Sequence, residues 1–328
     1  MKVAVIGTGN MGTALAHLLA DNGHSVACWD HMPQVVEDIR KNRQNSQYLP
    51  GVTLPSSVTA DLLLNHVVRE AGIIFIASPS AYFRQAVKEF SPFSLPKAVV
   101  VGASKGLEAG TGKRMSQVYA EAAVHSDDHY VALSGPAIAN EFARKKPTAV
   151  LLASQNHSYL NKVKEALSNP YFRVETSSDM AGAEWGGVLK NIYALGFGLL
   201  DGLGEGRPNL KAAFVTLALS EMKSIAVKMG AQEKTLEGLA GLGDLVTTGF
   251  SADSHNRRLG EFLAGGMEFE KAVAQLGGVV PEGVKATSLV LETLGASISM
   301  PLARAIFTCL NQPAARPRFV DEVWKITD

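Results

Sequence analysis

The chain reads KVAVIGTGNMG over residues 2–12, and the fold of the first half can be inferred from this segment. A short apolar run leads directly into the pattern G-x-G-x-x-G, and a helical pattern then covers 11–22. This order is typical of a dinucleotide site: Gly7 permits a tight turn, Gly9 lets the backbone approach a pyrophosphate, and Gly12 lets helix and strand pack closely. Unpaired amides at the helix N-terminus would then face the phosphates. The alternative is a glycine turn that only connects two elements.

Short apolar runs and helical patterns alternate through the rest of the first half. The runs are continuous, as expected of strands that are covered on both faces, and they predict strands at 3–6, 25–29, 73–77, 98–101, 131–134 and 149–153. Helical patterns lie between several of them, at 11–22, 35–42, 83–90 and 112–123. The alternation predicts an α/β domain with a Rossmann-type, doubly wound and mostly parallel sheet.

The pattern changes near residue 180, where long apolar helical segments replace the strands. These helices are expected at 183–200, 210–229, 256–264, 269–276, 284–294 and 301–310. We therefore expect an all-α second domain, with a dinucleotide-binding domain over 1–178 and a helical substrate and catalytic domain over 179–328.

Composition excludes several classes of protein. Lys plus Arg and Asp plus Glu are both 31 in 328 residues, so no global field would attract nucleic acid or an anionic membrane. The chain has two cysteines and no Cys/His cluster, which argues against a disulfide framework and a metal site. No apolar run approaches the ~20 residues of a membrane-spanning helix. We expect a cytoplasmic protein that works without a metal.

The second predicted strand ends beside an acidic residue, Asp30. It lies 18 residues beyond Gly12, near the ~20 expected for the carboxylate that bonds the ribose 2′-OH. Such a carboxylate repels a 2′-phosphate, so we expect NAD to be preferred, with NADP as a possible cofactor. Alternatively, Asp30 caps the following segment. Residues 77–80 should lie at the carboxyl edge of the sheet, either as part of this site or as a turn that begins a helix.

Two lysines are candidates for chemistry. Lys105 follows a predicted strand, which puts a cation at the carboxyl edge of the sheet, although a lone surface lysine is usually only solvated. Lys190 lies with Asn191 inside an apolar helix, where an unpaired ammonium is costly. It therefore has a partner or titrates at a reduced pKa, and both states suit proton transfer. The alternatives are a structural ion pair or a side chain that reaches solvent.

Two further motifs lie downstream. Residues 241–248 should place the carboxylate of Asp244 in a tight glycine loop, and residues 254–258 should place hydroxyl, amide and guanidinium groups at a helix start, a suitable grip for phosphate. The alternative is a capped helix with basic surface residues.

Taken together, the motifs resemble those of the NAD(P)-dependent glycerol-3-phosphate dehydrogenases over nearly the whole chain. Those that carry the resemblance are Gly7-x-Gly-x-x-Gly12-Thr13-Ala14-Leu15-Ala16, Tyr48-Leu49-Pro50, Lys105-Gly106-Leu107-Glu108, Ser134-Gly135-Pro136, Gly187-x-x-Lys190-Asn191, Asp201-Gly202-Leu203-Gly204, Gly241-Leu242-Gly243-Asp244-Leu245 and Asn256-Arg257-Arg258.

The resemblance implies reversible hydride transfer between NAD(P)H and dihydroxyacetone phosphate, feeding phospholipid synthesis. It makes Lys190 the proton donor and acceptor, Asp244 the residue that orients it, and Lys105 a contact of substrate oxygen or cofactor. The expected substrate-binding residues are Lys105, Gly135, Ala137, Ser254, His255, Asn256 and Arg257. With the residues above, the expected cofactor-binding set is Gly7, Gly9, Asn10, Met11, Gly12, Asp30, His31, Pro79, Phe83, Lys105, Ala139, His255, Val280 and Glu282.

The chain departs from the family pattern at a few positions. His255 stands where the family usually has an arginine that contacts phosphate and cofactor, and histidine is shorter and often neutral near pH 7. Arg257 is a candidate for compensation. Leu217 replaces another arginine, Ala137 a serine or threonine, and Pro281 a valine. The chain is therefore identified as a divergent member.

Two rival functions stay open from the sequence. A dehydrogenase of the 3-hydroxyacid or ketopantoate type would pair its helical lysine with an asparagine one turn later, where this chain has Ala194. A non-catalytic NAD-binding sensor would need the glycine loop but not Lys105, Lys190 and Asp244. The apolar helical half makes a homodimer reasonable, and the required partner is a small phosphorylated substrate.

The central geometric expectation is that the amine of Lys190 meets a nicotinamide held by the first half of the chain.

Overall fold

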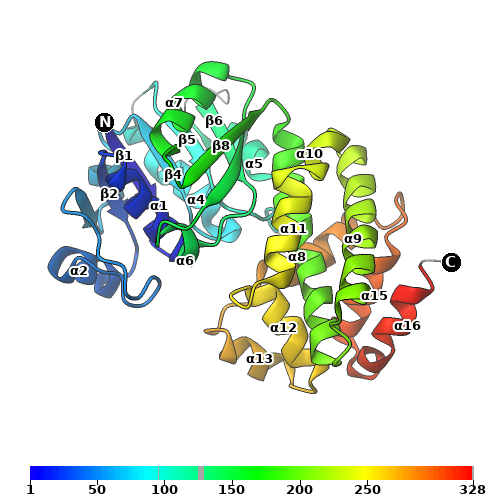
Figure 1. Ribbon diagram of the computed structural model, residues 1–328. Helices are drawn as coiled ribbons and strands as arrows, with labels where there is room; N and C mark the ends of the chain where they lie inside the picture. Colours follow the sequence, from blue (N-terminus) through cyan, green and yellow to red (C-terminus); the bar gives the residue numbers. More distant parts are fainter. Residues whose placement is uncertain (95, 125–128, 327–328) are drawn as a thin grey trace. The chain divides into compact units, whose positions relative to one another are not determined.

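A computed structural model describes residues 1–94, 96–124 and 129–326. The chain divides into two compact units (Figure 1). The first unit comprises Met1–Glu108 and Lys113–Met180, and the second comprises Ala109–Gly112 and Ala181–Asp328.

The first unit is built on an eight-stranded sheet of order β3-β2-β1-β4-β5-β6-β7-β8. All six predicted strands are present, with ends that shift by at most one residue. The strands are β1 (Lys2–Ile6), β2 (Ser25–Trp29), β3 (Val58–Asp61), β4 (Ile73–Ile76), β5 (Val99–Gly102), β6 (Tyr130–Ser134), β7 (Thr148–Ala153) and β8 (Phe172–Ser177).

The two strands that the sequence did not predict are the edges of the sheet. In β8, Phe172 and Val174 are buried while Arg173 and Glu175 are exposed, and β3 alternates in the same way. An edge strand with one exposed face lacks the continuous apolar run of a central strand, so neither strand could be predicted from such a run.

Every strand pairing is parallel except that of β6 with β7. The order β3-β2-β1-β4-β5-β6 is that of the Rossmann fold, in which the strand order reverses between β1 and β4. The predicted fold class is therefore confirmed. Ligands of such sheets bind outside the carboxyl ends of the strands at this reversal, where β1 ends at Ile6 and β4 ends at Ile76.

Helices flank the sheet, and the predicted ones are present with small shifts. They are α1 (Asn10–Asp21), α2 (Pro33–Asn42), α3 (Leu64–Val68), α4 (Phe83–Phe90), α5 (Met115–Ala122), α6 (Ala139–Phe142) and α7 (His157–Leu167). The helix expected from residue 112 begins only at Met115, because Leu107 pairs with Arg114 in an antiparallel bridge.

The second unit is helical, as expected. Its helices are α8 (Met180–Gly202), α9 (Pro208–Lys228), α10 (Glu233–Glu237), the π-helical turn η4 (Leu239–Gly243), α11 (Asp244–Phe250), α12 (His255–Ala264), α13 (Phe269–Gln275), α14 (Glu282–Leu294), α15 (Pro301–Asn311) and α16 (Phe319–Trp324).

Helix α8 is the core of this unit, since every residue from 185 to 200 is buried. Helix α12 packs against it almost backbone to backbone. A Cβ on Gly198 would lie 1.8 Å from the carbonyl oxygen of Arg257, and one on Gly260 would lie 2.1 Å from that of Leu195. Glycine is therefore required on both helices, and this contact fixes the first turn of α12 beside α8.

The described residues contain neither a membrane-spanning helix nor a metal-binding cluster. None of the described helices is long and apolar enough to span a bilayer. Within the same ranges, no group of three or more His, Cys, Asp or Glu side chains is arranged to hold a metal ion.

Candidate active site

The glycine loop between β1 and α1 has the geometry that a dinucleotide requires. Gly7 has φ +90°, a conformation that side chains with a Cβ disfavour. A Cβ on Gly12 would lie 1.8 Å from the carbonyl oxygen of Gly7, whereas a Cβ on Gly9 would meet no described atom within 4 Å. The loop is thus tightly packed at Gly12 and open at Gly9, so the residues present fit a bound pyrophosphate.

The first turn of α1 completes this cradle. Gly9 is the N-cap residue and offers no side chain to the amides of the first turn, which leaves the positive end of the helix for an anion. Asn10 is exposed and Met11 is half-buried on this turn. Both predicted cofactor residues therefore lie where the loop opens.

Asp30 makes the capping contact that the sequence offered as an alternative, and it also contacts the glycine loop. Its carboxylate is buried, and Oδ2 accepts hydrogen bonds from the amide and the hydroxyl of Thr8 at 2.9 and 2.7 Å. Oδ1 accepts from the amide of Met32, the N-cap residue of α2, at 3.0 Å and lies 3.3 Å from Nδ1 of His31. Asp30 thus anchors the glycine loop and the start of α2, and the exposed His31 is its neighbour.

Residues 77–80 divide between the surface and the core. Pro79 is exposed after β4, at the predicted edge of the sheet. Phe83 is fully buried and packs edge-on against Tyr130, with ring centroids 6.3 Å apart. The predicted position of the Phe83 ring at the cofactor is therefore corrected: it lies in the core, and the exposed aromatic residue of this segment is Tyr82.

Lys105 and Gly135 are brought together at the carboxyl ends of β5 and β6. The Lys105 ammonium donates to the carbonyl oxygen of Gly135 at 2.9 Å, and Gly135 has φ +103°. Ala137 is half-buried just beyond, and Ala139 begins α6. The sequence-predicted cation thus lies at the ligand-binding edge of the sheet.

In the second unit, Lys190 is buried with polar partners, as the sequence predicted. Its Nζ donates to the hydroxyl of Thr248 at 2.7 Å and lies 3.2 Å from Oδ1 of Asp244. Thr248 in turn contacts Asp244 at 3.3 Å. The ammonium is therefore held by a carboxylate and a hydroxyl. Thr248 received no role from the sequence, although its position one turn after Asp244 on a helix was a usable signal.

The prediction of a tight glycine loop around Asp244 is wrong. Residues Leu239–Gly243 form the π-helical turn η4, and Asp244 is the first residue of α11. The glycines permit close packing instead: a Cβ on Gly241 would lie 1.9 Å from the carbonyl oxygen of Leu236, and one on Gly186 would lie 2.2 Å from that of Ala240. This approach of η4 to α8 brings Asp244 to Lys190.

Asn191, the residue after Lys190, takes part in a chain of amide hydrogen bonds. Asn256 donates to the side-chain oxygen of Asn191 at 3.0 Å and accepts from the amide of Gly283 at 2.9 Å. Glu282 and Val280, just before Gly283, are half-buried. The predicted residue Asn256 therefore lies beside α8, linked through Asn191, which was not among the predicted site residues.

The first turn of α12 carries the remaining predicted residues. Ser254 caps the helix by accepting from the amide of Arg257 at 3.2 Å, so the helix start is confirmed. His255 is exposed by surface area. Partial desolvation of its imidazole, and to a smaller extent the positive charge of Arg258, lower the pKa of His255. A neutral His255 at pH 7 is a weaker phosphate donor than arginine.

Arg257 is paired with acidic side chains of the helical unit. Its Nε and Nη2 atoms both lie 2.7 Å from Oδ2 of Asp201, and Nη1 lies 3.3 Å from Glu261. Lys211 also binds Asp201, at 2.5 Å. The guanidinium is therefore occupied inside the helical unit, and the expected compensation for His255 is not seen there.

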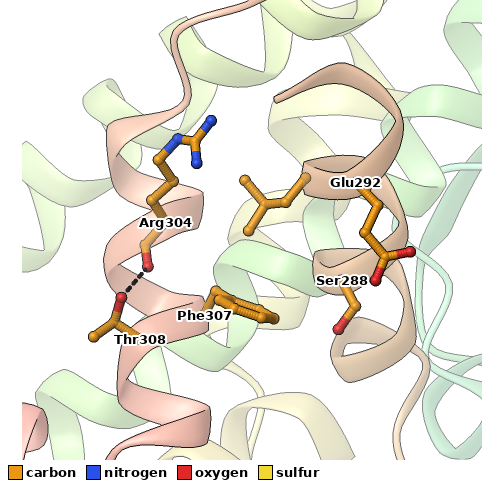
Figure 2. A pocket seen from close by; sticks show the side chains of 6 residues that line it. Ser288, Glu292, Arg304, Phe307 and Thr308 are labelled. Carbon is orange, nitrogen blue, oxygen red and sulfur yellow. Dashed lines mark hydrogen bonds between the residues drawn. The ribbon is translucent and has the colours of Figure 1, made fainter. Parts of the chain in front are cut away.

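A surface hollow elsewhere on the helical unit does not coincide with these residues. It has a volume of about 350 Å³ and lies between α14 and α15, as Figure 2 shows. Its lining residues are Ser288, Leu291, Glu292, Arg304, Phe307 and Thr308. None of them is a predicted site residue, so the hollow gives no support to the site.

Comparison with known proteins places both halves of the chain in one family. Residues 2–160 match the model of the NAD-dependent glycerol-3-phosphate dehydrogenase N-terminus, and residues 179–320 match that of the C-terminus. The chain is 39% identical over 318 residues to a glycerol-3-phosphate dehydrogenase [NAD(P)+] of Chlorobium phaeobacteroides, covering 96% of this chain and 95% of the relative. Identity to the Carboxydothermus hydrogenoformans protein of the same name is 37%, covering 94% and 92%.

A solved structure agrees with this grouping. The crystal structure of glycerol-3-phosphate dehydrogenase from Coxiella burnetii superimposes with a TM-score of 0.92 and 33% identity, covering 99% of this chain and 98% of that one. The resemblance inferred from the motifs is thus confirmed. The chain belongs to the NAD-dependent glycerol-3-phosphate dehydrogenase family.

Proposed function

We propose that the protein interconverts sn-glycerol 3-phosphate and dihydroxyacetone phosphate by hydride transfer with NAD(P). The observation that carries the proposal is the buried cluster of Lys190, Asp244 and Thr248. It lies in a family member whose glycine loop fits a dinucleotide.

When bound, NAD(P)H would supply the hydride for carbon 2 of the ketone. In our proposal, Lys190 gives the proton to the oxygen on that carbon and takes it back in the reverse direction. Asp244 and Thr248 fix the position of Nζ and restrict its motion, which favours transfer along one direction. A cation beside the oxygen also stabilises the alkoxide character that develops during the reaction.

We assign the substrate phosphate to the first turn of α12. Ser254, His255 and Asn256 lie at this helix start, and a helix N-terminus favours an anion. Lys105, Gly135 and Ala137 are proposed as the contacts that the first unit makes with the substrate. Because Arg257 is paired with Asp201, we give it the role of holding α12 instead of the phosphate.

The deciding experiment is oxidation of NADH by dihydroxyacetone phosphate, followed by absorbance, in the wild type and in Lys190→Ala. We expect kcat to fall about 10²–10⁴-fold in the variant, the usual contribution of a positioned general acid. The dissociation constant for NADH should not change. Lys228→Ala, an exposed lysine of α9, is the matched control. An unchanged kcat in Lys190→Ala removes Lys190 from the mechanism.

For the cofactor, we propose a preference for NADH over NADPH. The support is the carboxylate of Asp30 at the end of β2, which accepts hydrogen bonds and disfavours a second anion nearby. Asp30→Asn should raise the kcat/KM for NADPH relative to that for NADH. Equal efficiencies with both cofactors in the wild type contradict the preference.

The wider setting completes the proposal. We propose a cytoplasmic homodimer whose product enters glycerophospholipid synthesis, with residues 1–178 as the dinucleotide-binding domain and 179–328 as the substrate and catalytic domain. Sedimentation of the purified protein tests the dimer, which requires twice the mass of one chain.

A further inference from the structure

We propose that Asn45 is a positioning residue for the cofactor: it orients the Thr8–Gly9 peptide of the glycine loop so that the Gly9 amide faces the ligand. The inference rests on the dinucleotide-binding role proposed for this loop. Every residue that carries it lies in the first unit.

The peptide groups of Thr8 are held on two sides. On one side, Asp30 accepts from the Thr8 amide and hydroxyl. On the other, the Thr8 carbonyl oxygen accepts from Nδ2 of Asn45 at 2.7 Å and from the hydroxyl of Thr13 at 2.9 Å. Nδ2 of Asn45 also lies 2.8 Å from that hydroxyl. Thr8, Asp30, Asn45 and Thr13 are all buried, so these contacts are shielded from water and hold the loop firmly.

The bond to the Thr8 carbonyl determines where the next amide points. In a trans peptide the C=O and N–H groups lie in one plane and point in opposite directions. The carbonyl of Thr8 points to the buried Asn45, so the N–H of Gly9 points the other way. Apart from Gly9 and its chain neighbours, no described atom lies within 4 Å of the position of a Cβ on Gly9, so the loop is open at this residue. Asn45 thus keeps the Gly9 amide, and not the Thr8 carbonyl oxygen, directed toward a bound phosphate.

Asn45 can do this because its own loop is rigid. Its Oδ1 accepts from the amide of Tyr48 at 3.3 Å, and its main-chain oxygen accepts from the amide of Leu49 at 2.8 Å. The guanidinium of Arg43 closes the loop by donating to the carbonyl oxygens of Pro55 and Val58, each at 2.9 Å. The amide of Asn45 is therefore presented in one fixed position.

The first experiment measures the dissociation constants of NADH and NADPH by fluorescence titration, without substrate. Asn45→Asp is the sharpest variant, since it keeps the acceptor for Tyr48 but replaces the donor to Thr8 with a repelling oxygen; Asn45→Ala accompanies it. We expect both dissociation constants to rise about tenfold, and by the same factor, because Asn45 contacts the loop and not the 2′ group of the ribose. Gln47→Ala, an exposed residue of the same loop, should bind both cofactors like the wild type.

A second readout needs no ligand. Hydrogen–deuterium exchange of the peptide covering residues 7–13 should be faster in Asn45→Asp than in the wild type, because the loop is no longer held. An unchanged exchange rate together with unchanged dissociation constants overturns the proposal. So does a change in the ratio of the NADH and NADPH constants, which would place Asn45 at the 2′ position.

If the Asn45 variants fail to fold, variants of Thr13 test the proposal instead. Thr13→Val removes the hydroxyl shared by Asn45 and Thr8, and Thr13→Ser keeps it. Weaker NADH binding in Thr13→Val but not in Thr13→Ser supports the proposal, and equal binding in the two refutes it. Failure of the proposed function would look different: NADH would bind normally to the wild type, with no turnover of dihydroxyacetone phosphate.

Discussion

Asp30 in the first unit and Asp244 in the second are both buried, 6% and 2% exposed, but they bind different kinds of group. Asp30 accepts from the main-chain amides of Thr8 and Met32, together with the Thr8 hydroxyl. Asp244 contacts the side chains of Lys190 and Thr248. The first carboxylate fixes the path of the chain, and the second fixes a group that carries a proton. Burial alone does not separate these roles; the partner does.

The same contrast separates the two regions as a whole. In our proposal, main-chain amides of the glycine loop bind the cofactor, and the buried side chains around the loop orient the backbone. Around Lys190 the group that we propose to react is itself a side chain, and buried residues contact it directly. Substitutions should therefore affect cofactor affinity in the first region and turnover in the second.

Asp244→Asn should have the largest effect. It leaves the buried ammonium of Lys190 without a carboxylate, and removing one partner of a buried ion pair costs about 3–5 kcal/mol of stability. We expect a reduced free energy of unfolding in urea and a kcat about 10²-fold lower, with NADH affinity retained. Asp30→Asn, the matched variant, should keep kcat at saturating cofactor. Similar kcat losses in both variants would erase the contrast.

Gly12→Ala and Gly9→Ala come next, as a pair within one loop. A Cβ at Gly12 overlaps the carbonyl oxygen of Gly7, while one at Gly9 enters open space. Overpacking of this kind costs about 1–3 kcal/mol. Thermal unfolding should therefore show a lower Tm for Gly12→Ala only, whereas NADH titration should show weaker binding for both. A wild-type Tm in Gly12→Ala would mean that the loop is less tightly packed than described.

His255→Arg should have a smaller effect, confined to the substrate. A permanently charged bidentate donor replaces an imidazole whose pKa is lowered by desolvation and by Arg258. The KM for dihydroxyacetone phosphate should fall about tenfold, with little change in the KM for NADH. In the wild type, the same KM should fall as the pH drops below 6.5, where His255 begins to protonate. An unchanged KM for dihydroxyacetone phosphate in His255→Arg would contradict the assignment of the substrate phosphate to α12.

Substitution of Glu221 should have the smallest effect on turnover. It tests whether the kind of group that a buried carboxylate binds also determines its role in the second unit. Glu221 caps α15 by accepting from the amides of Leu302 and Ala303 at 2.9 and 2.8 Å, as Asp30 does for its backbone. Desolvation raises the pKa of its carboxyl group. The folded protein therefore holds the proton more tightly than the unfolded chain does, so this contribution to stability is lost as the pH rises from about 4.5 through the folded pKa.

The measurement compares the free energy of unfolding of the wild type and Glu221→Gln from pH 4 to pH 8. The difference between them should shift against the wild type as the pH rises and then level off, while kcat stays close to that of the wild type. A large loss of kcat with intact stability would show that a backbone-capping carboxylate can also act in turnover.

Much of the fold could be predicted because central strands and core helices are continuous apolar runs. The edge strands β3 and β8 were not predicted because each has an exposed face. The candidate site also has features that the sequence could predict and features that it could not. The burial of Lys190 in α8 could be predicted from its apolar neighbours, but its partner Thr248 lies 58 residues away. Asn45 lies 37 residues from Thr8, and no local pattern links them.

The alternation of strands and helices, the glycine loop and a buried lysine can all be inferred from the amino-acid sequence, because they depend on the local order of apolar, small and charged residues. The folded chain was needed to show which groups the buried carboxylates bind, that Asp244 begins a helix, and that Asn45 donates to the Thr8 carbonyl oxygen. Hydrogen bonds act over about 3 Å in space, and the fold sets which distant residues come within that range.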